Sequence, residues 1–179
     1  AILEPIPYRR RDFTVERDAL AHPWMAGHSD GVLEDEYLAQ EQADGLAVLE
    51  WATSQPWCSG RTGIYGISWG GFAGLQIAAL RPPSLGAVVA VGHTHDRFAE
   101  DVHYKGGCLL TENPSWASWM FAYQARSPDP AIVGDRWRSM WLERMACKPL
   151  TVPWMTHQTR DAYWRHGSIC EDWSAVQVP

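Results

Sequence analysis

The feature that most constrains the fold is the run Gly66-Ile67-Ser68-Trp69-Gly70. It reads G-x-S-x-G, the pattern of a nucleophile elbow, in which a serine stands at the tip of a sharp turn between a strand and a helix. Such a turn strains the backbone at Ser68 and crowds the positions two residues away, so both flanks require glycine. The N–H of Trp69 then points toward a developing oxyanion, and the positive end of the helix dipole assists it. The pattern makes Ser68 a candidate nucleophile.

The flanking sequence supplies the context that this motif requires. Residues 61–67 are strand-like, residues 72–80 are helix-like until Pro82 and Pro83 stop them, and residues 87–91 are typical of a buried parallel strand. Strand, turn, helix and strand in this order predict an α/β fold. A structural glycine-rich turn with an incidental serine remains the alternative.

The first third of the chain predicts one short strand end and two helices. Residues 2–7 resemble the end of a strand, and residues 14–27 a helix. Residues 34–54 form the clearest amphipathic pattern, which predicts a helix with acidic residues in its first turn. Its predicted apolar stripe comprises Leu38, Ala43, Leu46, Ala47, Leu49 and Trp51.

The pattern changes after Val91. Residues 92–96 form a loop at the end of a strand, where α/β sheets place ligand-contacting residues. No strand pattern is convincing between residues 97 and 166, whereas 115–123 and 131–145 are helix-like. We therefore expect a core over residues 1–94, an inserted helical cap over 95–166 and the start of a return to the core over 167–179.

The composition limits the kinds of partner and cofactor that this chain could bind. The net charge of −6 argues against nucleic acid and anionic membranes, and the longest apolar run, 87–91, is too short to span a bilayer. The four cysteines include no C-x-x-C, so neither a zinc site nor a redox motif is indicated and we expect no cofactor. A reducing cytoplasm is the default location. Because the chain opens on Ala1, we expect the natural protein to start earlier.

Two further groups of residues carry possible chemistry. The order Ser…Asp…His of a catalytic triad is met by Ser68, Asp96 and either His157 or His166; a loop acid with surface histidines is the alternative. Separately, residues 93–95 read H-x-H, but two imidazoles without a carboxylate set do not predict a metal site.

The elbow also carries a resemblance to a known family. Residues 57–71 resemble the elbow of the cocaine-esterase-like, X-Pro dipeptidyl-peptidase (S15) hydrolases, and the resemblance extends over nearly the whole chain. Shorter landmarks of the CocE/NonD branch follow in the family's order: Ile6-Pro7-Tyr8-Arg9, Ser29-Asp30-Gly31, Asp161-Ala162-Tyr163-Trp164 and Ile169-Cys170-Glu171-Asp172.

The resemblance implies an α/β-hydrolase core, a helical cap and a Ser–Asp–His triad acting on esters, amides or X-Pro peptides. Ser68 matches the nucleophile, and Tyr8 matches a tyrosine whose hydroxyl completes the oxyanion hole. The family would place a core strand between His28 and Ser29, which are adjacent here, and its catalytic Asp and His beyond Pro179.

We therefore expect an incomplete α/β hydrolase that acts on a small-molecule or peptide acyl substrate, without nucleic acid or membrane as partner. The alternative is a non-catalytic fragment or interaction module that keeps only the elbow fold.

Overall fold

The computed structural model describes residues 1–3, 5 and 31–179, and these form two compact units. Unit 1 comprises Ala1–Pro5, Tyr37–Leu110 and His157–Pro179, and unit 2 comprises Ile6–Glu36 and Thr111–Thr156. The expected helix at 14–27, Tyr8 and the junction of His28 with Ser29 lie outside the described residues. The three-part division at residues 94 and 166 stays a prediction.

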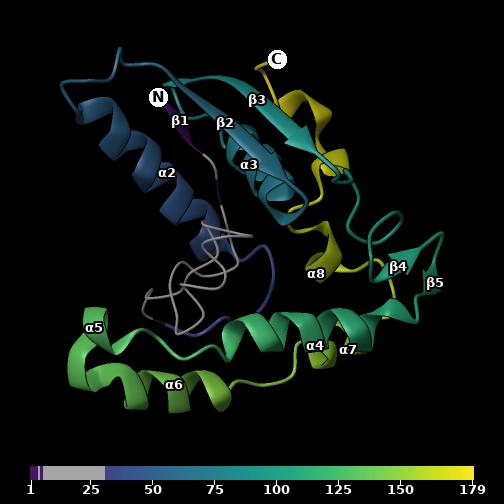
Figure 1. Ribbon diagram of the computed structural model, residues 1–179. Helices are drawn as coiled ribbons and strands as arrows, with labels where there is room; N and C mark the ends of the chain where they lie inside the picture. The colour runs from purple at the N-terminus through teal and green to yellow at the C-terminus, as the bar shows by residue number, and fades with distance from the viewer. Residues whose placement is uncertain (4, 6–30) are drawn as a thin grey trace. The chain divides into compact units, whose positions relative to one another are not determined.

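Unit 1 contains a parallel sheet of the order β1-β2-β3 (Figure 1). Strand β1 spans Ile2–Leu3, β2 spans Thr62–Ile67 and β3 spans Leu85–Val91. Strand β1 pairs with β2 over two residues only, whereas β2 and β3 pair along their whole length. The two predicted strands around the motif are therefore present, and they are neighbours.

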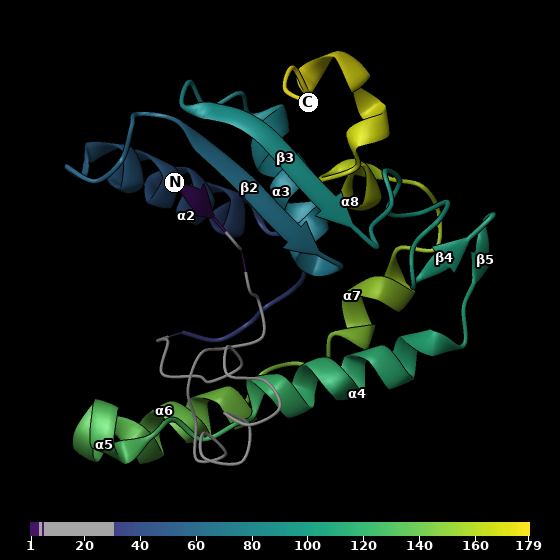
Figure 2. The ribbon, with the colours of Figure 1, turned by 45° about the horizontal axis from the view of Figure 1, so that its top comes forward.

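Two helices cover one face of this sheet (Figure 2). Helix α3 (Trp69–Ala79) packs against β2 and β3, and α2 (Ala39–Ser54) packs against α3 and β2. Their shared core consists of Leu49, Ile64, Ile77, Ala78 and Leu85. The opposite face of the strands is apolar and exposed, at Tyr65, Ile67, Val89 and Val91.

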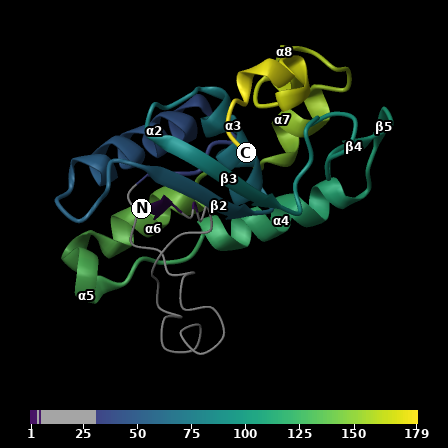
Figure 3. The same cartoon turned by 90° about the horizontal axis from the view of Figure 1, so that it is seen from above.

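The end of the chain returns to this sheet. After α8 (Ala162–Arg165), two 3₁₀ turns, η2 (Ile169–Glu171) and η3 (Trp173–Ala175), lead to the carboxyl terminus. The Pro179 carbonyl accepts a 2.8 Å hydrogen bond from Val88 N on the outer edge of β3 (Figure 3).

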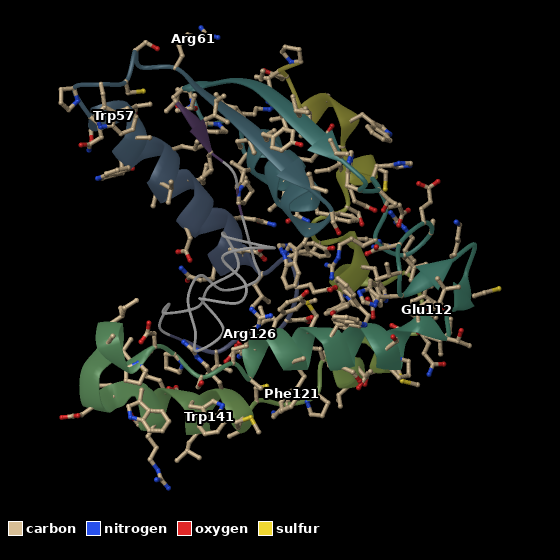
Figure 4. All side chains as sticks on the ribbon, viewed as in Figure 1. Trp57, Arg61, Glu112, Phe121, Arg126 and Trp141 are labelled. Carbon is tan, nitrogen blue, oxygen red and sulfur yellow. The ribbon has the colours of Figure 1, made fainter. Side chains whose placement is uncertain are left out.

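Unit 2 is helical in its described residues, with α4 (Glu112–Gln124), α5 (Pro130–Val133), the 3₁₀ turn η1 (Gly134–Arg136), α6 (Trp137–Met145) and α7 (Thr151–Thr156). The buried stripe of α4 follows the helical period: Asn113, Ala117, Met120 and Gln124. Trp141 on α6 donates its indole N–H to the Ala125 carbonyl (2.7 Å), next to the labelled Arg126 (Figure 4). The predicted helices at 115–123 and 131–145 are confirmed, the second with a break at Gly134, where φ is +60°.

Three expectations differ from the structure. Helix α2 begins at Ala39, not at residue 34, so Asp35 and Glu36 do not lie in its first turn. Both are buried, and they accept hydrogen bonds from the indoles of Trp154 (3.1 Å) and Trp116 (2.5 Å). Trp51, placed on the apolar stripe of α2, is 59% exposed.

The third difference is a small hairpin where no strand was expected. Strands β4 (Tyr104–Lys105) and β5 (Cys108–Leu109) pair antiparallel around Gly106 and Gly107, whose φ values of +58° and +82° suit a tight turn.

The described helices include none with the length and apolar character to cross a membrane.

Candidate active site

Ser68 stands alone between β2 and α3, as the motif predicts. Its φ of 55° and ψ of −122° lie in a region that favours glycine. Its backbone closes the turn on both sides: Ser68 N donates to the Val91 carbonyl (2.8 Å), and its own carbonyl accepts from Gly71 N (2.8 Å) and Phe72 N (3.1 Å). The side chain is half-buried, and within the described residues its hydroxyl makes no hydrogen bond. The turn thus presents a hydroxyl group in strained but well-supported backbone.

The glycines around the serine are explained by close backbone contacts. A β-carbon at Gly66 would collide with the carbonyl of Gly70, one turn further along the chain. A β-carbon at Gly70 would lie 2.6 Å from the Pro5 carbonyl oxygen. Both contacts are with backbone, which cannot swing aside as a flexible side chain does. No other residue fits at either position without moving the backbone.

The residue after the serine is anchored by its side chain. Trp69 is 1% exposed, and its indole N–H donates to Glu41 of α2 (2.6 Å). Its ring meets the ring of Tyr37 edge-on at 5.6 Å, and Tyr37 in turn packs against Phe72 at 4.8 Å. These contacts hold the first turn of α3, from which the backbone N–H groups point toward the serine end of the helix.

The H-x-H segment follows β3 at the same edge of the sheet. His93 lies beside the turn. A β-carbon at Gly71 would be 3.2 Å from His93 Cβ, and the imidazole ring of His93 lies edge-on to the Phe72 ring, with 6.1 Å between the ring centroids. Burial, with a smaller contribution from His95, lowers the pKa of His93, so its neutral form is favoured. His95 instead faces Glu100 (3.2 Å) and the ring of Trp173.

Asp96 is held by partners other than histidine. Its carboxylate accepts from the backbone N–H groups of Phe98 (2.9 Å) and Ala99 (3.1 Å) and from Arg160 Nε (3.2 Å). Arg160 also contacts Glu171. Burial by itself raises the pKa of Asp96, but the hydrogen bonds and Arg160 together hold it below the usual range.

The two candidate histidines have separate partners. His157 Nδ1 lies 2.6 Å from Asp161 Oδ2, and its ring stacks on Tyr163 at 4.3 Å. That hydrogen bond is the main cause that lowers the pKa of Asp161. His166 Nε2 donates to the Tyr37 carbonyl (2.8 Å). Among the described residues, no hydrogen bond joins either histidine to Asp96 or to Ser68.

Sequence reasoning missed several residues around the turn. Tyr37 and Glu41 fall within the helix predicted over residues 34–54 but were not singled out, and Arg97 falls within the expected cap over residues 95–166. Arg97 is 1% exposed. No periodic pattern marks them, because their partners come from distant segments. The described residues contain no group of three or more His, Cys, Asp or Glu side chains that is arranged to hold a metal ion.

Comparisons with known proteins find both a matching sequence family and similar solved structures. The sequence model of the X-Pro dipeptidyl-peptidase (S15) family matches residues 1–179. Two crystal structures of a CocE/NonD family hydrolase from Staphylococcus aureus align with TM-scores of 0.65 and 0.64, each at 24% identity over 86% of this chain. The chain spans 24% of the length of these relatives. No curated protein sequence matches it.

Proposed function

The chain belongs to the X-Pro dipeptidyl-peptidase (S15) family, and from this premise we propose that it carries the nucleophile of a serine hydrolase. Ser68 would attack the carbonyl carbon of an ester, amide or X-Pro bond and form an acyl-enzyme. The observation that carries the proposal is the conformation of Ser68, with φ of 55° between β2 and α3. Strained backbone at a single polar residue is typical of functional sites.

The oxyanion would be stabilised at the start of α3. In the proposed mechanism the N–H of Trp69 and the Tyr8 hydroxyl both donate to it, the latter as the family resemblance implies. Preorganised donors of this kind act without reorganising during the reaction. The indole bond to Glu41 and the contact with Tyr37 support the role of Trp69, because they hold its backbone in place.

The base is the unassigned part of the proposal. A serine hydroxyl is a poor nucleophile until a base takes its proton, and a positioned base contributes about 10²–10⁴-fold. Within the described residues Ser68 has no hydrogen-bonded base. We therefore expect the isolated chain to be a very weak esterase, with the residual activity that an oxyanion hole alone supports.

The experiment compares this chain with its Ser68→Ala variant, using hydrolysis of a p-nitrophenyl ester and labelling by a fluorophosphonate probe, with the labelled peptide mapped by mass spectrometry. Slow labelling at Ser68 that disappears in the variant supports the proposal. Absence of labelling in both favours a non-catalytic fold that keeps the turn.

Strong, Ser68-dependent turnover would contradict the expected weakness and show a base within the chain. His157 would then be mutated first, because Asp161 already orients its ring; His166 and Asp96 would follow.

A further inference from the structure

Arg97 is a buried cation to which the proposed chemistry assigns no role. It lies six residues after the end of β3, and its guanidinium donates from Nη1 to the carbonyls of Tyr163 (3.0 Å) and His166 (2.7 Å). Its Nε and Nη2 have no hydrogen-bond partner within the described part of the chain. Burying a charge with unsatisfied donors is unfavourable, so a compensating interaction is needed.

Three aromatic rings provide that compensation. The guanidinium carbon lies 4.8 Å from the ring centroid of Tyr37, 5.1 Å from that of Tyr163 and 5.5 Å from that of Trp164. All three distances are within the range of cation–π attraction, which is strongest where water is excluded. We name Arg97 with these three rings the Arg97 cage. Removing the charge would remove the attraction that holds the rings around it.

Tyr37 connects the Arg97 cage to the serine turn. One side of its ring faces Arg97, and the ring also contacts Trp69 and Phe72, in the first turn of α3. Tyr37 has a φ of 58°, an unfavourable conformation for a side chain of its size. Its carbonyl is held by His166, whose own carbonyl is held by Arg97. Arg97 therefore fixes both the ring and the backbone of Tyr37.

We propose that Arg97 is a positioning residue for Ser68, acting through Tyr37 on the first turn of α3. The inference rests on the proposed function for its catalytic consequence, but its structural part stands by itself. Arg97 touches neither Ser68 nor, in this proposal, the substrate. It keeps Tyr37 packed under Trp69 and Phe72, so that the Trp69 N–H and the Ser68 hydroxyl keep their orientation.

The test compares three variants of the full chain by hydrogen exchange of individual amides. Arg97→Met keeps much of the side chain's bulk but removes the charge and the donors, whereas Arg97→Lys keeps a cation. Arg81→Met is the matched control, because Arg81 also donates to two carbonyls, those of Ser174 (2.9 Å) and Ala175 (3.0 Å), at the far end of α3.

In Arg97→Met, we expect the Ser68 and Phe72 amides to exchange about tenfold faster, the size of effect that losing a desolvated cation–π contact produces. The Leu80 and Arg81 amides at the far end of α3 should not change. Arg81→Met should accelerate exchange at residues 80 and 81 and leave the Ser68 and Phe72 amides unchanged. Arg97→Lys should restore most of the protection of the Ser68 and Phe72 amides. Uniform acceleration along α3 in Arg97→Met, or no rescue by Lys, would overturn the proposal.

A second readout separates this inference from the proposed function. Fluorophosphonate labelling of Ser68 should slow about tenfold in Arg97→Met and stay near the unaltered rate in Arg81→Met. If the unaltered chain is not labelled at all, the proposed function fails, while the exchange pattern still decides whether Arg97 positions the turn.

Discussion

The two ends of α3 contain the same backbone anomaly in different surroundings. Ser68, before the helix, has a φ of 55°, and Arg81, after it, has a φ of 56°. At the Ser68 end the turn is crowded by backbone from Pro5 and Gly70 and by the ring of Tyr37 behind Trp69. At the Arg81 end the residue is exposed, and its side chain reaches the carbonyls of Ser174 and Ala175.

The difference shows what maintains each conformation. Helices commonly end with one left-handed residue, usually glycine. The Arg81 conformation is of this kind, and glycine would adopt it with less strain. Ser68 precedes the helix, where this C-terminal motif does not apply; besides the glycines of its own motif, the hydrogen bond from its N–H to the Val91 carbonyl of β3 holds its conformation. The backbone of Ser68 is therefore bonded to another strand of unit 1, whereas at Arg81 only the side chain reaches a distant segment.

The largest expected effect is from Gly66→Val. This variant should lower the free energy of unfolding by about 3 kcal/mol or more, because the new β-carbon at residue 66 would meet the Gly70 backbone. Gly60→Ala is the control for backbone strain without crowding: Gly60, unlike Gly66, has a positive φ (+82°), and no atom lies near its missing β-carbon, so about 1–2 kcal/mol is expected. Urea unfolding followed by circular dichroism measures both. If both variants lose the same free energy of unfolding, the backbone contact at Gly66 does not destabilise the chain beyond ordinary backbone strain.

Ser68→Gly should stabilise the chain by about 1 kcal/mol or more, because glycine adopts this conformation without strain. The same variant removes the proposed nucleophile, so stability and probe labelling should change in opposite directions. Thermal unfolding with Ser68→Ala as the reference measures the gain. A lower melting temperature than that of Ser68→Ala would contradict the assignment of strain to this residue.

Arg81→Gly should change stability by less, about 0.5 kcal/mol in either direction. Relief of the left-handed conformation is opposed by the loss of two hydrogen bonds to the carbonyls of Ser174 and Ala175. Urea unfolding beside the Ser68→Gly variant makes the comparison direct. A gain larger than that of Ser68→Gly would reverse the ranking of the two ends.

The smallest effect is on the pH dependence of stability. The pKa of Asp96, in the loop that follows β3, is lowered by its hydrogen bonds and Arg160 in spite of burial, and the pKa of Asp172, near Arg81, is lowered mainly by the Ser174 hydroxyl. A lowered carboxyl pKa stabilises the folded state above the unfolded pKa of about 4, and this is lost as pH falls through the folded pKa.

Asp96→Asn should therefore weaken the acid dependence of unfolding below about pH 4, and Asp172→Asn should weaken it less, because Asp172 is solvated. Urea midpoints measured between neutral pH and acid give both slopes. If the urea midpoint depends on pH with the same slope in both variants, the two carboxylates contribute equally to acid stability, which contradicts this prediction.

How much was predictable depends on how far apart in sequence the contacting residues lie. The strand, turn and helix around Ser68 were predictable, because the clash at Gly66 is with Gly70 of the same motif. The hairpin at Gly106 and Gly107 was also encoded locally, since paired glycines are a strong turn signal, but two-residue strands are too short to show an alternating pattern.

The start of α2 shows the opposite case. Asp35 and Glu36 have the composition of a helix N-terminus, yet indole N–H groups from residues 116 and 154 bind them. A buried carboxylate must be hydrogen-bonded, and the partners are about 80 residues or more away. Propensity cannot contain that information, so the helix starts at Ala39 instead.

The sequence by itself determined that a serine stands at a glycine-flanked turn in an α/β fold, because steric limits between neighbouring residues act at short range. Only the tertiary structure decided which groups surround that serine: Tyr37 behind Trp69, Arg97 over Tyr37, and Asp161 rather than Asp96 beside His157. These contacts join residues whose positions become neighbours only after the sheet and helices have packed. Cation–π attraction and buried hydrogen bonds act over a few ångströms, and spacing along the chain does not reveal which groups will come that close.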